Sequence, residues 1–168
     1  GFNGRILSCT CDNYLELVEK TDPKFMEKFV FQFPDFDDPL LNGPQINFSD
    51  PNKFYQEFCD RYPGTWSAVS WEYAAILEMW KSAVESSRTV EPMTVLAMMK
   101  VGGRGSHVFG EAKWWGRELF GIDNALVGDW PVVTIRNGKA RIVEFGSTID
   151  WWNEHSALLI KHMRELNL

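Results

Sequence analysis

The sequence lacks the features that mark several broad classes of protein. Its 168 residues carry a formal net charge of −6, which argues against the basic face that a nucleic-acid partner would need. No apolar run approaches the roughly 18–20 residues of a membrane-spanning helix. No signal peptide is visible, and the chain opens on Gly-Phe-Asn without a methionine. The 45% of hydrophobic residues is enough for one compact domain with a core.

Cysteine is scarce as well. Cys9, Cys11 and Cys59 are odd in number, which excludes complete disulfide pairing within one chain. Cys9 and Cys11 stand two residues apart in an expected strand, too close to bridge each other easily. No further ligand near them completes a zinc site. We expect buried free thiols, with metal or redox use as the alternative.

Motifs of catalysis are also missing. The run Gly102-Gly103-Arg104-Gly105 follows an expected helix instead of joining a strand to a helix, so it is a weak match to a phosphate-binding loop. Neither a Gly-x-Ser-x-Gly elbow nor a His-Glu-x-x-His helix occurs. No Cys/His pair is supported as nucleophile and base. The sequence favours a binder over an enzyme, with no metal and no cofactor.

An acidic loop is expected over residues 34–47, where Asp35, Asp37 and Asp38 lie close together. Calcium binding would need spaced oxygen ligands and a later bidentate glutamate, and that full pattern is absent. We interpret the loop as a solvated acidic connection, with calcium as the alternative.

The most informative stretch runs from Tyr62 to Ser87. Pro63-Gly64 breaks the chain, and Thr65 or Ser67 is expected to cap a new helix. Its apolar residues recur at helical spacing and predict one broad apolar face that packs on a sheet: Val69, Tyr73, Ile76, Leu77, Trp80 and Val84.

Other helices are expected on the same grounds. Their ranges are Tyr14–Lys20, Asp50–Tyr62, Pro92–Lys100 with Thr89 as its cap, and Ile149–Leu166. The helix that starts at Asp50 should bury Phe54, Tyr55, Phe58 and Tyr62. His155 and His162 on the last helix are read as surface or core-edge side chains.

Four extended stretches are expected. They are Arg5–Cys11, covered on both faces, Phe29–Phe33, stopped by Pro34, Ala125–Ile135, interrupted at Trp130-Pro131, and Ala140–Glu144. Asn137-Gly138 predicts a two-residue hairpin turn between the last two, since both residues tolerate positive φ.

Residues 107–123 are expected to be irregular. We interpret the Trp114-Trp115 pair within them as the edge of a core, with a sugar platform or aromatic cage as the alternative.

The order of these motifs resembles a known family. In sequence they are Gly-x-x-Gly-Arg-Ile-Leu, Phe-Val-Phe-Gln-Phe-Pro, Phe-Tyr-Gln-Glu-Phe-Cys-Asp-Arg-Tyr-Pro-Gly, Trp-Glu-Tyr-Ala-Ala-Ile-Leu and Val-Val-Thr-Ile-Arg-Asn-Gly-Lys-Ala-Arg-Ile-Val. Together they resemble the C-terminal half of a type I periplasmic solute-binding protein, in the group of branched-chain amino acid or amide receptors of ABC importers.

This resemblance implies a three-layer α/β fold of which only the C-terminal half is present. Residues 1–33 and 131–168 would belong to the second lobe and residues 34–130 to the first. The ligand would sit between the lobes, at the C-terminal ends of the strands. Asp12 would meet a ligand ammonium group, Thr10 would supply a hydroxyl contact and Phe33 would be a weaker contact; Asp12 could equally serve as a helix cap, alone or in addition.

The resemblance also implies function and partners. The intact parent would be a periplasmic or lipid-anchored receptor that binds a small polar solute and hands it to the membrane subunits of an ABC importer. A ligand-sensing regulatory domain of the same fold is the alternative. Because half of the fold would be missing, the apolar helix face and open strand edges predict a homodimer or an assembly that exchanges elements.

Overall fold

The computed structural model describes residues 2–11, 14–44, 46, 50–67 and 69–166, without the side chains of residues 71, 72, 104 and 106. It is a mixed α/β protein, which confirms the predicted fold class in its coarse form. Within the described residues, six strands form one sheet in the order β1-β2-β5-β4-β3, and β6 pairs with β5 outside this order. Among the described strands, the pair of β1 and β2 is parallel and the other pairs are antiparallel. The three-layer lobe arrangement stays a prediction.

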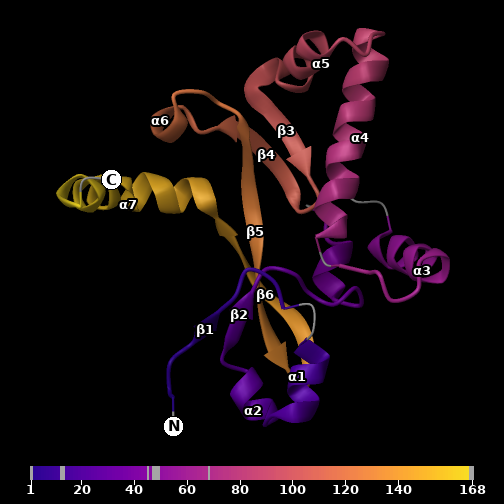
Figure 1. Cartoon of the computed structure of the whole chain (residues 1–168), viewed down its shortest axis with the longest axis vertical. Coiled ribbons are helices and arrows are strands. Elements are labelled where there is room, and N and C mark those ends of the chain that lie inside the picture. The colour runs from indigo at the N-terminus through magenta and orange to yellow at the C-terminus, as the bar shows by residue number, and fades with distance from the viewer. Residues whose placement is uncertain (1, 12–13, 45, 47–49, 68, 167–168) are drawn as a thin grey trace.

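A long hairpin runs through the molecule (Figure 1). Strand β5 spans Ala125–Arg136 and β6 spans Lys139–Ser147. Asn137 and Gly138 have φ of 52° and 75°, which confirms the predicted two-residue turn. The expected interruption at Pro131 is wrong: Pro131 pairs with Phe145, and the register shifts only between Val132 and Val133. The boundary proposed at residue 131 therefore falls inside a continuous strand.

Two short strands join the hairpin near its turn. Strand β1 covers Ile6–Leu7 and pairs with β2, Phe29–Phe31, which in turn pairs with β5. The longer strand expected up to Cys11 is wrong, and so is its burial on both faces, since Leu7 is 78% exposed. Cys9 is exposed and Cys11 half-buried, because this segment leaves the sheet after two residues.

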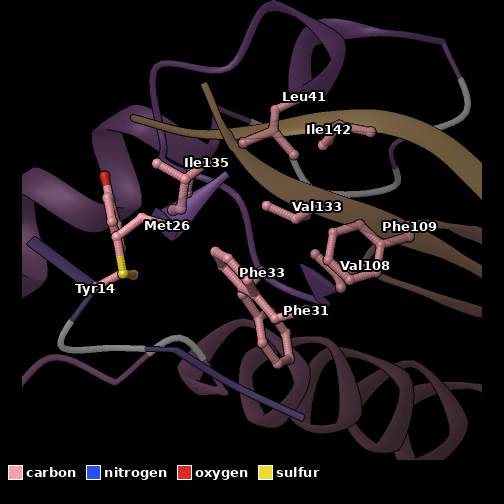
Figure 2. Close-up of a cluster of buried hydrophobic side chains, with 11 residues drawn as sticks. Tyr14, Met26, Phe31, Phe33, Leu41, Val108, Phe109, Val133, Ile135 and Ile142 are labelled. Carbon is pink, nitrogen blue, oxygen red and sulfur yellow. The ribbon is translucent and has the colours of Figure 1, made fainter. Parts of the chain in front are cut away.

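Two short helices cover the same end of the sheet. Helix α1, Tyr14–Lys20, has the predicted bounds, and α2 spans Pro23–Met26 behind the cap Asp22. A cluster of buried hydrophobic side chains extends from these helices across the hairpin to Val108 and Phe109 (Figure 2). It includes Met26, Val133 and Ile135, which are at most 1% exposed.

The acidic loop lies along the outer edge of β6. A 3-10 turn, η1, spans Pro39–Asn42 behind its cap Asp38. Asp38 is 2% exposed and accepts from the backbone N–H groups of Leu40, at 2.9 Å, and Ile142, at 2.7 Å. Asp35 accepts from the Ala140 N–H, and its own N–H donates to the Ala140 carbonyl. The predicted solvated connection is therefore wrong for Asp35 and Asp38, because their carboxylates accept from edge N–H groups that no described strand takes. Asp37 is about half exposed.

Helices α4 and α5 reach the other end of the molecule, whereas α3 is drawn nearer its middle (Figure 1). Helix α3, Pro51–Arg61, begins behind Asp50 as predicted, with Phe54, Tyr55 and Phe58 half-buried, whereas Tyr62 is 52% exposed. Helix α4 spans Ser70–Ser87 and has Val69 at its N-cap without a side-chain hydrogen bond. The predicted cap at Thr65 or Ser67 is wrong, because Val69 occupies the N-cap position. The Thr65 hydroxyl donates to the Tyr62 carbonyl. Helix α5, Pro92–Met99, is capped by Glu91 rather than Thr89.

Most of the stretch 107–123, which was expected to be irregular, lies in strands and a helix, and residues 108–109, 116 and 121–123 lie outside them. A 3-10 turn, η2, at Val101–Gly103 leads into β3, Arg104–His107, and β4, Gly110–Trp115, which pairs with the first part of β5. Helix α6 spans Arg117–Phe120. The last helix, α7, covers Thr148–Glu165 behind the cap Ser147 and extends away from the sheet (Figure 1).

The predicted sheet-facing side of α4 is wrong. Tyr73, Ile76, Leu77 and Trp80 are 65%, 51%, 65% and 46% exposed. The helix instead turns Ala75, Met79 and Ala83 inward. Small side chains let α4 approach the sheet closely at Gly105, where an added Cβ would lie 2.8 Å from a Leu126 methyl carbon and 3.7 Å from the Met79 sulfur.

Candidate functional site

A groove separates α4 from the sheet at this end of the molecule. Its volume is about 390 Å³, within the range of small-molecule sites. Helices α4 and α5 contribute Ala75, Ile76, Met79 and Met99. The strands and the loop before β5 contribute His107, Val108, Trp114, Asn124, Leu126 and Trp130. The wall is predominantly apolar, with one imidazole and one amide.

A second cavity, of about 400 Å³, lies on the other flank of α4. It shares Ala75, Met79, Met99 and His107 with the groove. Its outer wall is more polar, since Glu78, Ser82 and Ser86 line it. The four shared residues come from α4, α5 and β3 and form a common floor of the two cavities.

His107 is the titratable side chain of this floor. Its Nδ1 accepts a hydrogen bond of 3.0 Å from the Phe109 N–H, so the neutral ring carries its proton on Nε2. Nε2 is buried and has no hydrogen-bond partner among the described residues. Burial lowers the pKa of His107, although the nearby Asp129 carboxylate opposes this. His107 is therefore a neutral ring at physiological pH.

Close packing holds the His107 ring in place. A Cβ at position 128 would lie 2.7 Å from Nε2, so glycine is required where β5 passes the imidazole. The ring centroids of His107 and Trp130 are 5.2 Å apart, and Trp130 meets Phe109 edge-on at 5.6 Å. The groove wall is thus continuous with the main core.

Polar contacts fix the rim of the groove. Trp114 Nε1 donates to the Met99 carbonyl at 3.0 Å. The Lys100 ammonium lies 5.2 Å from the centre of the Trp114 ring and also donates to the Asn124 side chain. These contacts orient the indole against the groove and place one amide and one cation at its mouth.

The residues predicted to bind a ligand lie elsewhere. Asp12 falls outside the described residues, both as a ligand contact and as a helix cap. Thr10 is half-buried beyond the end of β1, where its carbonyl accepts from the Ser8 hydroxyl. Phe33 is 7% exposed and packs edge-on against Trp130, one layer behind the groove. Neither Thr10 nor Phe33 lines the groove, and their predicted ligand contacts stay predictions.

The remaining candidates separate in the same way. Trp114 lines the groove, whereas Trp115 stacks edge-on with Trp152 of α7, at 5.2 Å. His155 lies flat against Trp151, with ring centroids 5.0 Å apart, and His162 contacts Glu165. No cluster of three or more metal-ligating side chains occurs in the described part of the chain.

Sequence reasoning missed His107, Met79 and Met99. Small or apolar residues alternate with charged ones in Gly110–Trp115, and this pattern could have predicted the strand β4. Strand β4 pairs with β3, which carries His107. Met79 follows the same helical period as Ala75 and Ala83. This second apolar face of α4 was overlooked because its residues are smaller than those of the outer face, Tyr73, Ile76, Leu77 and Trp80.

Comparisons with family models, curated proteins and solved structures give no match. Across the described residues, no helix has both the length and the apolar character that crossing a membrane demands.

Proposed function

We propose that this chain is a non-enzymatic binding module that holds a small, largely apolar ligand between α4 and the sheet. The observation that carries the proposal is the groove, whose walls are methionine, tryptophan and leucine side chains with few polar groups. Methionine walls adapt to irregular ligands because the side chain is unbranched and polarizable.

The polar groups of the groove suit recognition better than catalysis. His107 has its Nδ1 occupied by the backbone and its Nε2 enclosed, so it offers a neutral ring face. Asn124 at the mouth carries an amide that suits an uncharged polar group on the ligand. A ligand with an apolar body and one amide or similar group at its end fits this arrangement.

The sequence resemblance extends this proposal. The parent protein would be a periplasmic solute-binding receptor of an ABC importer that binds a branched-chain amino acid or amide, and of these an amide has the uncharged polar end that the groove suits. A ligand-sensing regulatory domain of the same fold is the second candidate. Both rest on the order of the sequence motifs, and both include the binding step that the groove supports.

Methyl NMR of the six methionines tests the binding step. We expect leucine, isobutyramide or benzene, titrated singly, to shift the Met79 and Met99 methyl resonances and to leave Met26 and Met163 unchanged. Ala75→Leu fills the groove and should abolish the shifts, whereas Ala157→Leu on the exposed part of α7 should preserve them. If none of the three probes moves Met79 or Met99, the proposal is wrong.

A further inference from the structure

The outer face of α4 forms an apolar stripe made of Tyr73, Ile76, Leu77 and Trp80. These positions are i, i+3, i+4 and i+7 of one helix, so their side chains share one face. All four are between 46% and 65% exposed. Their combined exposed area is on the order of 400 Å², about the largest apolar patch that a typical soluble monomer shows.

The whole molecule also exposes more surface than a compact monomer of its mass. Its accessible area is 11,277 Å² for 19.4 kDa. The area expected from mass alone is roughly 8,500 Å², so the chain exposes about a third more. A stable dimer buries about 800 Å² from each partner, which the excess area can supply. The stripe would give about half of that, and the rest would come from the flanks of a helix about 27 Å long.

The stripe is close to palindromic. A large ring stands at each end, and two branched aliphatic residues stand between them, with spacings of three, one and three residues. If two copies of α4 pair antiparallel about a two-fold axis between Ile76 and Leu77, each Tyr73 lies opposite the partner's Trp80. Each Ile76 then lies opposite the partner's Leu77. This arrangement matches the self-complementary surface that a two-fold interface requires.

We propose that this chain forms a homodimer in which the α4 stripes of two copies pack antiparallel. The occupant of the stripe is therefore a second copy of the chain. Ile76 also lines the groove, so the interface would border the ligand site without entering it. Apolar pairing must overcome the repulsion between two chains that each carry a formal charge of −6.

Sedimentation of the purified chain tests the association. We expect twice the 19.4 kDa chain mass at micromolar concentration. Salt should strengthen the dimer by screening the like charges. Leu77→Glu should weaken it at least about 30-fold, as loss of a central contact does. Leu158→Glu, at a 58% exposed leucine of α7, is the matched control and should remain dimeric. A wild-type monomer at 100 µM, or a Leu77→Glu variant that stays dimeric, overturns the proposal.

Cross-linking tests the antiparallel arrangement. The background variant carries Cys9→Ser, Cys11→Ser and Cys59→Ser, and circular dichroism verifies its fold. A mixture of Tyr73→Cys chains with Trp80→Cys chains should form mixed disulfides. Tyr73→Cys alone should not, because an antiparallel pair separates the two copies of that position by about 10.5 Å along the axis. Efficient self-cross-linking of Tyr73→Cys, or the absence of mixed disulfides from the mixture, contradicts the arrangement.

Discussion

The two ends of the molecule cover their apolar side chains very differently. Around β2 and the hairpin turn, Met26, Val133 and Ile135 are at most 1% exposed. On α4 at the other end, Tyr73 and Leu77 are each 65% exposed. The first end is enclosed by α1, α2 and the acidic loop, and the second has cavities on both flanks of α4. Stability is therefore concentrated at one end, and the surfaces suited to binding at the other.

Polar groups follow the same division. At the enclosed end, the Tyr14 hydroxyl donates to both carboxylate oxygens of Asp35, at 2.5 and 2.6 Å. Burial first, and then this hydrogen bond, raise the pKa of Tyr14, and burial also raises the pKa of Asp35. At the open end, His107 Nε2 is buried without a partner among the described residues. Unsatisfied buried groups are rare in structural cores, which fits a recognition role for the open end.

The largest expected loss of stability comes from a substitution in the enclosed core. Ile135→Ala removes a side chain that is 1% exposed, and it should lower the free energy of unfolding by about 2–5 kcal/mol. Ile122→Ala at the open end, where the residue is 52% exposed, is the matched control and should change it by no more than about 0.5 kcal/mol. Urea titration of both variants measures the difference. Equal effects would mean that the two ends are equally packed.

The next effect concerns the acidic loop. Asp38→Ala leaves the N–H groups of Leu40 and Ile142 without their acceptor and should lower the free energy of unfolding by about 2–4 kcal/mol. Asp37→Ala is the control on the same loop. Its carboxylate is about half exposed and forms ion pairs of 2.7 Å with Lys139 and Arg141, which should contribute about 1 kcal/mol or less. Thermal melts at pH 7 compare the two.

A smaller effect is expected at the hairpin turn. Gly138→Val places a β-branched residue at a φ of 75° and should cost about 1–3 kcal/mol. The cause is backbone strain alone, because no atom lies within 4 Å of the new Cβ. Gly138→Asn is the control and should cost less, since asparagine tolerates this conformation. An unchanged melting temperature for Gly138→Val would show that the turn relaxes freely.

The smallest effect is a pH dependence from the open end. Because the folded-state pKa of His107 lies below its unfolded value of about 6.5, the unfolded chain takes up a proton first as the pH falls. Stability from this residue is thus present above pH 6.5 and is lost from there down to the lowered pKa. His107→Asn keeps an acceptor for the Phe109 N–H and cannot titrate, so its melting temperature should fall less between pH 7 and 5. Identical pH profiles for wild type and variant would contradict the assignment.

Local patterns in the sequence predicted those elements whose causes are local. The bounds of α1, the Asp50 cap of α3 and the Asn137-Gly138 turn depend on backbone sterics and on contacts within a few residues. Such local causes can be recognised in a short stretch of sequence. Thr65 shows the limit of this reasoning, because α4 begins later, behind Val69, and the Thr65 hydroxyl donates to the Tyr62 carbonyl.

Tertiary structure alone decided the candidate site. Which face of α4 meets the sheet depends on the glycine at position 105 and the leucine at position 126, far along the chain. Pro131 continues a strand because β6 supplies Phe145 as its partner, whereas β4 and β2 pair with β5 before and after this position. The carboxylate of Asp38 is buried because the Ile142 N–H, 104 positions away, needs an acceptor. Each of these contacts depends on residues that are distant in the sequence. The spacing of apolar residues in α4 therefore predicted a helix, but it could not determine which of the two apolar faces would be buried.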